Sequence, residues 1–548
     1  MALWQAIAIG FFYYLGWSFY GGTMFMGWDS PIMNVFWSGL ILGDIKTAMI
    51  VGATIQPMFI AFMGAGGNMP TDGIAAGMLT AALIITSKGA ISIESAIALA
   101  VPVGLVMSTA QTLRQLTASI WVQMADRYAE KLDTRGIKLA GIVYSNLSKI
   151  ILFWIPMTLI LYFGAPLVTT MLSSMPAWLE NGLSVIGGML PALGMAMTLF
   201  VIGRRALLPL FIAGFFFVQY THIGNIPLLL VALFIAFLYM TFTKDKSDEE
   251  GEGGLNLATI FSRKKEGDGV AHILTQKEVD RTYWWWLFQV ECAHSFERLQ
   301  GLGFCIAMIP NLVKLYKDKP DELRAALKRH LMFFNTQGIW GSVIHGITLA
   351  LEEQRAMGQD VDPELIINLK AGLMGPFAGI GDTIDSSTFR PLLLAFFIPF
   401  GLQGHWWAGW LPWAIFVGAT YTYGLFFFRF GYRSGTQAAL SILESGLIKK
   451  VITFFCVLGL FVLGGLSASF ISVQTPLVIP AAGGAGLGIG VQRQILDMIL
   501  PGMLSLVTVF ATYSYLRKRN GNMLRASLGL MAIGLVLGSL GILGTPVG

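Results

Sequence analysis

Two glycine-rich stretches carry the carboxylates that could act on a solute inside a membrane. The first spans residues 64–73 and delivers Asp72, and the second spans residues 375–385 and contains Asp382 and Asp385. Ionisable residues within irregular apolar sequence are costly in lipid and persist mainly where they line a protein cavity. One such stretch in each half predicts a transport site between two repeat-like halves. The alternative is an ordinary surface loop in which Asp72 or Asp382 only begins a helix.

The polar side chains near these stretches suit a sugar or another uncharged polyol, because they offer donors and acceptors for hydroxyl groups. Asn68, Asp72, Glu297 and Asp382 are predicted to lie nearest the solute, and the further candidates are Gln56, Thr71, Phe296 and Gln337. The carboxylates are expected to contribute most, since charge-assisted hydrogen bonds are stronger than neutral ones. The run Trp284-Trp285-Trp286 could offer an aromatic face, although interfacial anchoring is the commoner role of such tryptophans.

The sequence lacks the motifs that are typical of soluble enzymes. The glycine-rich residues 483–490 lack the spacing of a dinucleotide-binding loop, and no phosphate-binding G-x-x-x-x-G-K-S/T motif is present. Glu291 and His294 have the E-x-x-H spacing of di-iron bundles, but a second such pair is missing. None of the six histidines lies in a pattern typical of a phosphoryl carrier. We therefore expect no catalytic residue, no metal and no cofactor in this chain.

The composition places these residues in a membrane protein. Of 548 residues, 55% are hydrophobic and 12% are charged, about half the ~25% charge of soluble domains. The mean hydropathy is +0.67. We predict an all-α polytopic membrane protein of two related helical halves, with about ten to sixteen membrane segments, some of them broken or re-entrant. The net charge of +5 indicates loop orientation, not a nucleic-acid partner.

The charged stretches predict the domain organisation. Polar, glycine-rich sequence between residues 244 and 269 cannot bury apolar area, which predicts domains at residues 1–245 and 276–548 with a cytoplasmic linker at 246–275. A long structured loop within one domain is the alternative. The basic residues between Arg114 and Lys149 are expected on the cytoplasmic side. Residues 318–351 alternate charged and apolar types as an amphipathic helix does. Such a helix could lie on the membrane surface or pack against a soluble partner, and the alternative is a helix with one solvated face.

The second half resembles the IID component of the mannose-family sugar phosphotransferase system. The resemblance lies in four ordered blocks, at residues 296–304 (FERLQGLGF), 330–337 (HLMFFNTQ), 348–356 (TLALEEQRA) and 372–382 (GLMGPFAGIGD), with Arg390-Pro391 after them. The first ~245 residues more loosely resemble the IIC component, through residues 43–47 (GDIKT), 51–54 (VGAT) and the Pro70-Thr71-Asp72 loop. These components are usually separate chains, so the sequence looks like a natural or engineered IIC-IID fusion.

The resemblance implies a multi-pass protein of the bacterial cytoplasmic membrane that binds a hexose or amino sugar outside and presents it to the cytosol. There a IIB component, charged by IIA, would phosphorylate the sugar. Neither partner is encoded here, which accounts for the missing phosphoryl-carrier motif. The resemblance also implies a homo-oligomer, expected to be a trimer, in the lipid bilayer.

Some positions depart from the family pattern. Gln56 stands where many IIC chains have an acidic residue, Asp385-Ser386 replaces a frequent aromatic pair, and Gly338 replaces a frequent proline. These departures favour a more polar pocket and a substrate other than plain mannose or glucose. Two other mechanisms stay open: a phosphorylation-independent, proton-coupled sugar transporter, and a membrane enzyme or receptor scaffold without cargo.

Overall fold

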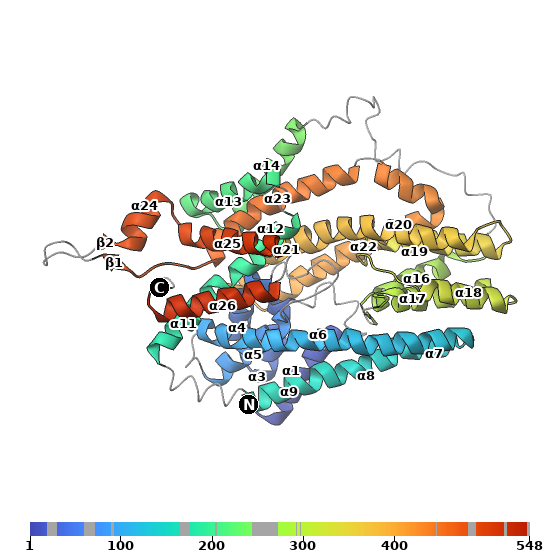
Figure 1. The fold of residues 1–548 in the computed structure, drawn as a ribbon, viewed down its shortest axis with the longest axis horizontal. Helices are drawn as coiled ribbons and strands as arrows, with labels where there is room; N and C mark the ends of the chain where they lie inside the picture. Colours follow the sequence, from blue (N-terminus) through green and yellow to red (C-terminus); the bar gives the residue numbers. More distant parts are fainter. Residues whose placement is uncertain are drawn as a thin grey trace.

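The computed structural model of the chain is almost entirely helical, which confirms the all-α prediction (Figure 1). The only strands among the described residues are β1 (Val478–Ile479) and β2 (Ile489–Gly490), an antiparallel pair. The structure describes residues 1–18, 30–59, 72–88, 93–164, 176–202, 205–243, 272–291, 293–295, 297–444, 447–479, 489–519 and 523–544. Most of the predicted linker lies outside these ranges.

The helices of the two halves are listed here in chain order, with 3-10 and π segments marked η. The first half contains α1 (Leu3–Trp17), α3 (Pro31–Leu42), α4 (Ile45–Ile55), η1 (Gln56–Phe59), α5 (Gly73–Thr86), α6 (Ile93–Glu130), α7 (Thr134–Lys138), η2 (Leu139–Tyr144), α8 (Ser145–Lys149), η3 (Ile150–Trp154), α9 (Ile155–Leu159), η4 (Ile160–Gly164), α11 (Ala177–Met189), α12 (Pro191–Ile202), η5 (Arg205–Leu207), α13 (Leu208–Thr221) and α14 (Asn225–Phe242). The second half contains α16 (Gln276–Gln289), α17 (Gly301–Leu315), α18 (Pro320–Leu331), α19 (Ser342–Ala356), α20 (Pro363–Gly381), η7 (Asp382–Phe389), α21 (Arg390–Leu402), α22 (Trp407–Glu444), α23 (Leu447–Phe470), η8 (Gln492–Leu496), α24 (Asp497–Ile499), α25 (Met503–Lys518) and α26 (Met523–Ser539).

The two halves pack into one another. Helix α23 of the second half packs against α13 and α14 of the first, while α11 packs against α26 and α12 against α25. Glycines allow the closest approach: a Cβ on Gly214 would lie 1.9 Å from the Phe461 carbonyl oxygen, and one on Gly464 would lie 2.0 Å from the Phe211 carbonyl oxygen. Small residues at such crossings bring helix backbones together where lipid removes the hydrophobic drive. These contacts form one apolar core from both halves, the first core.

Five helices in the described part of the chain are long and apolar enough to cross a membrane. They are Ser95–Glu130, Thr134–Gly164, Asn181–Phe200, Trp407–Arg433 and Thr453–Phe470. A sixth span would be the pair Gln492–Ile499 and Met503–Lys518, which bends by 63° at a short break and fits the broken or re-entrant helices expected. The number is below the predicted ten to sixteen segments because several other apolar helices have only 10–17 residues.

The span from Thr134 to Gly164 alternates α and π turns and presents a straight lipid-facing stripe. Its exposed apolar residues recur at every fourth position: Leu139, Val143, Leu147, Ile151, Ile155, Leu159 and Phe163. In a pure α-helix a four-residue spacing drifts by about 40° per step. The wider π turns at η2, η3 and η4 offset this drift. Only 22% of the apolar window is buried, so this helix faces the lipid.

A second apolar core lies at the far end of α6. Val122, Ala125 and Ala129 of α6 pack there with α16, α17, α18 and α19 of the second half, and this group is called the second core. A helix of 38 residues is about 57 Å long, well beyond the ~30 Å hydrocarbon layer. The second core therefore projects from the membrane at one end, where Figure 1 shows α16 to α19 gathered beside α6 and α7.

Two local expectations differ from the structure. Residues 318–351 are not one amphipathic helix, because residues 332–341 separate α18 from α19 and bond to another loop, as the Phe334 carbonyl does to the Gln300 N–H. The second glycine-rich stretch is not a break in a helix either. Helix α20 continues through Gly381 into the π-helical η7 and on into α21. A π segment widens the helix without ending it, and such segments are frequent at functional sites.

Candidate functional site

Asp72 lies at the start of α5, where three helices of the first half meet. Its Oδ1 accepts a hydrogen bond from the Ala75 N–H at 2.9 Å, and its Oδ2 accepts one from the Tyr13 hydroxyl at 2.6 Å. The Asp72 N–H donates to the Gly104 carbonyl of α6 at 2.9 Å. Asp72 is thus a helix N-cap, and its buried carboxylate also joins α1 to α5.

Gln56 lies where α4 tightens into η1. Its side chain is buried, and Oε1 accepts a hydrogen bond from the Ile32 N–H at 3.1 Å. Among the described residues, none hydrogen-bonds to its Nε2. Helix α12 packs against η1, where a Cβ on Gly194 would lie 2.9 Å from the Pro57 carbonyl oxygen, and α12 also packs against η7. One helix of the first half therefore contacts both the Gln56 segment and the π segment that begins at Asp382.

In the second glycine-rich stretch, the buried acid is Asp385. Its Oδ2 accepts a hydrogen bond from Gln337 Nε2 at 3.1 Å, and its Oδ1 accepts from Trp340 Nε1 at 3.1 Å and from the Tyr423 hydroxyl. Gln337 Oε1 in turn accepts from the Ile339 N–H at 2.9 Å and the Trp340 N–H at 2.8 Å. The amide predicted to bind a solute is thus already hydrogen-bonded within the protein. Asp382 lies one turn before Asp385 and is half-buried.

A chain of polar and aromatic contacts links Asp72 to the second half. Trp17 follows Tyr13 by one turn of α1, and the Arg114 guanidinium carbon lies 6.0 Å from the centroid of its ring. Arg114 lies on α6 and donates from Nη1 to the Glu291 carbonyl oxygen at 3.0 Å. Gly104, which accepts from Asp72, lies ten residues earlier on α6, about 15 Å away along the helix. Helix α6 therefore connects the backbone at Asp72 in one half to the backbone at Glu291 in the other.

Glu291 is the centre of this contact between the halves. Its Oε2 lies 2.7 Å from His294 Nδ1, and its Oε1 accepts from Gln300 Nε2 at 3.0 Å. Burial alone would raise the pKa of the Glu291 carboxyl, but His294, Arg114 and Gln300 outweigh it and hold that pKa at about 2. The ionised carboxylate therefore lies within ion-pair distance of Nδ1. His294 is buried, and its Nε2 has no hydrogen-bond partner among the described residues.

The loop after Glu291 is fixed to the first half by a second contact. Arg298 makes a two-pronged ion pair with Asp126 of α6, at 2.7 and 2.8 Å. Leu299, next to it, has a left-handed backbone with φ of +45°, which is strained for a leucine. Glu297, a predicted solute-binding residue, is exposed on this loop. Asn68, Thr71 and Phe296 lie outside the described residues.

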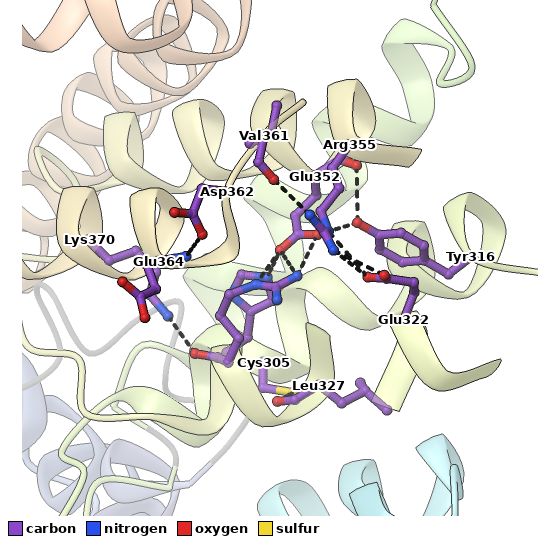
Figure 2. A network of polar contacts seen from close by, with 12 residues as sticks. Cys305, Tyr316, Glu322, Leu327, Glu352, Arg355, Val361, Asp362, Glu364 and Lys370 are labelled. Atoms are coloured by element: carbon purple, nitrogen blue, oxygen red, sulfur yellow. Dashed lines mark hydrogen bonds and ion pairs between the residues drawn. The ribbon is translucent and has the colours of Figure 1, made fainter. Parts of the chain in front are cut away.

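A separate buried network lies in the second core (Figure 2). Glu352 of α19 accepts from Arg329 at 2.7 to 2.9 Å, from the Tyr316 hydroxyl at 2.6 Å, and lies 2.8 Å from His330 Nε2. Burial alone would raise the Glu352 pKa, but His330, Arg329 and Tyr316 hold it at about 2. Lys370 completes the network by donating to the Arg329 carbonyl at 3.2 Å. Every partner comes from the second half of the chain.

Sequence reasoning missed Tyr13, Arg114 and His294. Tyr13 and Arg114 lie far in sequence from the residues they contact, and neither belongs to a motif. Glu291 and His294 were considered only as metal ligands, whereas the structure pairs them with each other. Among the described residues, no group of three or more His, Cys, Asp or Glu could hold a metal ion.

Comparison with known sequence families divides the chain into two parts. The PTS system mannose/fructose/sorbose family IID component matches residues 273–543, and the PTS system sorbose-specific IIC component matches residues 3–238. PTS denotes the phosphotransferase system. Both matches agree with the resemblance drawn from the motifs.

Individual relatives match each half over most of their own length. The sorbose-specific EIID component of Lacticaseibacillus casei is 35% identical over 49% of this chain and 95% of its own. The mannose-specific EIID component of Escherichia coli K12 is 36% identical over 46% of this chain and 88% of its own. For the first half, the N-acetylgalactosamine permease IIC component 1 of E. coli K12 is 30% identical over 40% of this chain and 82% of its own.

Solved structures also match by sequence over about half of the chain. One, described as a membrane protein, is 34% identical with a TM-score of 0.45 and covers 50% of this chain and 99% of its own. Another, the mannose transporter ManYZ in complex with microcin E492, is 33% identical with a TM-score of 0.30 and covers 50% of this chain and all of its own.

From the family matches and the relatives of each half, the chain belongs to the mannose/fructose/sorbose family of the sugar phosphotransferase system, as a IIC and a IID component fused into one multi-pass, sugar-translocating membrane unit.

Proposed function

We propose that the chain binds a hexose or amino sugar from outside and presents it to a cytosolic IIB protein for phosphorylation, with IIA as the phosphoryl source of IIB. Relatives named for sorbose, mannose and N-acetylgalactosamine support this substrate range. The proposal includes the bacterial cytoplasmic membrane, a trimer, and the domain bounds 1–245 and 276–548 around a cytoplasmic linker at 246–275.

The observation that carries the proposal is the connection across the two halves between the buried Asp72 and the partly buried Glu291. Asp72 and Glu291 are linked through Tyr13, Trp17 and Arg114. A sugar bound between the halves would contact residues of both halves. Its release would accompany movement of one half against the other. The phosphoryl transfer is then the partner's chemistry, and this chain supplies binding and orientation.

We assign the sugar contacts to Asn68, Asp72, Glu297 and Asp382, with Gln56, Thr71, Phe296 and Gln337 as further candidates. His294 joins them, because a buried ring nitrogen without a described partner can bond a sugar hydroxyl. Hydrogen bonds to a charged group contribute about 1.5–3 kcal/mol, against ~1 for a neutral pair. The carboxylates should therefore dominate affinity for the sugar.

The test is uptake of labelled hexoses and amino sugars in cells that carry the general phosphotransfer proteins and a candidate IIB. Asp72→Asn and Asp382→Asn should each raise KM roughly tenfold, since one charge-assisted bond is weakened. Asp321→Asn is the control, because that side chain is 91% exposed and lies in the first turn of α18. Wild-type uptake in both variants would reject the site.

The same cells separate the mechanisms. We expect sugar phosphate to accumulate only while the phosphorelay is intact. Entry of unmodified sugar that survives loss of the relay and collapses with the proton gradient would make the chain a proton-coupled transporter instead.

A further inference from the structure

Basic side chains of the two halves lie near each other where the halves join at the edge of the membrane. Arg135 and Lys138 lie on α7 of the first half, and Arg281 lies on α16 of the second half. The Lys138 ammonium lies 5.4 Å from the ring centroid of Trp285, one turn after Arg281, and the charges of Lys138 and Arg281 act on each other. These four residues are called the basic seam.

The basic seam lacks acidic partners. None of its three cations forms an ion pair with a described residue. Of the nearby acids, Asp280 pairs with Arg429 at 2.7 Å, and Asp133 is the N-cap of α7, where it accepts from the Gly136 N–H at 2.9 Å. Like charges placed together without a counter-charge repel each other, so this arrangement favours a bound anion.

Two basic residues of α18 differ from those of the basic seam because they form ion pairs. Arg324 pairs with Asp321 at 2.6 Å, and Lys328 pairs with Glu130 at 2.5 Å. These two basic side chains therefore have the acidic partners that the three cations of the basic seam lack.

The height of the basic seam in the membrane follows from the lipid-facing stripe. That stripe begins at Leu139, directly after Lys138, and continues to Phe163. The 24 steps from residue 139 to residue 163, at about 1.5 Å each, cover roughly the thickness of the hydrocarbon layer. Lys138 and Arg135 therefore lie at the level of the lipid headgroups, and Trp284, 43% exposed on α16, suits the same boundary. The basic stretch to which they belong is expected on the cytoplasmic side.

We propose that Arg135, Lys138 and Arg281 bind the phosphate of an anionic phospholipid in the cytoplasmic leaflet, so that one headgroup joins the IIC and IID halves at the membrane edge. The lipid source is favoured over a free anion or a protein because the cations directly adjoin a surface that faces acyl chains. Bound lipid would neutralise the repulsion between Lys138 and Arg281 and hold α7 against α16.

The experiment measures lipid binding to the detergent-solubilised full chain by native mass spectrometry. Short-chain phosphatidylglycerol is the probe, with phosphatidylcholine of the same chain length and inorganic phosphate as comparisons. The triple variant Arg135→Gln, Lys138→Gln, Arg281→Gln should bind phosphatidylglycerol about 100-fold more weakly, from the typical contribution of each basic residue near an anionic surface. Arg324→Gln with Lys328→Gln is the matched control and should bind as the wild type does.

A second variant guards against a folding defect. Arg135→Lys, Lys138→Arg and Arg281→Lys keep the charges and should retain the preference for phosphatidylglycerol. Equal binding of phosphatidylcholine, or displacement of the lipid by inorganic phosphate at the same concentration, would overturn the proposal. A triple variant that keeps the lipid but loses sugar phosphorylation with IIB would also overturn the proposal, since the basic seam would then bind a protein.

Discussion

Glu291 and Glu352 each lie beside a histidine, Glu291 partly buried and Glu352 fully buried, and their surroundings hold both pKa values at about 2. Their partners differ in origin. Glu352 is bound by Tyr316, Arg329 and His330, all from the second half. The Glu291 residue is contacted by Arg114 of the first half as well. An acid satisfied within one half stabilises that half, whereas contacts drawn from both halves couple the two.

The largest expected effect is the loss of stability in Glu352→Gln. The substitution leaves Arg329 buried without its counter-charge, and breaking a buried pair in this way costs about 3–5 kcal/mol. The free energy of unfolding of the purified chain should fall by that amount. Glu322→Gln is the control, because its pair with Arg355 is partly exposed and should cost at most ~1 kcal/mol. Equal losses in both variants would contradict a structural role specific to Glu352.

A smaller effect is expected from pH. Burial, together with the charges of Lys370 and Arg329, lowers the pKa of His330 to about 4 even though Glu352 opposes the shift. The unfolded chain, with a His pKa near ~6.5, then binds the proton more readily. Stability is therefore complete above about pH 6.5 and falls by roughly 3 kcal/mol as the pH drops towards 4.

Thermal unfolding between pH 7 and 4 measures this loss. His330→Gln retains a neutral donor for Glu352 and should flatten the dependence in that range. An unchanged slope in this variant would assign the acid sensitivity to other groups.

The smallest effect on stability, with the clearest effect on transport, is expected for Glu291→Gln. The backbone carbonyl that accepts from Arg114 is retained, but the charge that orients His294 is lost. We expect KM to rise about tenfold, equivalent to ~1.4 kcal/mol, while stability changes less than in Glu352→Gln. Uptake kinetics and melting temperature, measured on the same variant, test both. A large loss of stability in Glu291→Gln with unchanged KM would contradict the different roles assigned to Glu291 and Glu352.

Part of the candidate site could be predicted from the sequence. The glycine-rich stretches indicated Asp72 and Asp382 as candidates because charges within apolar sequence are costly in lipid. The sequence did not show that Asp385 is the more deeply buried acid, since the π segment η7 turns it towards Gln337, Trp340 and Tyr423. The role of Gln337 as a loop contact was equally hidden, because its partners are backbone groups that no motif identifies.

The amino-acid sequence by itself determined the membrane class, the helical fold and the family, because hydrophobic run length, charge content and short ordered motifs are local properties. The period of four along residues 139–163 was also present in the sequence, although only the alternation of α and π turns explains why it stays on one face. The tertiary structure alone decided which charges meet. Arg114 and Glu291 are 177 positions apart, and Asp126 and Arg298 are 172 apart. Such contacts depend on how α6 crosses between the halves, and helix packing fixes that crossing through many weak contacts that no single motif encodes.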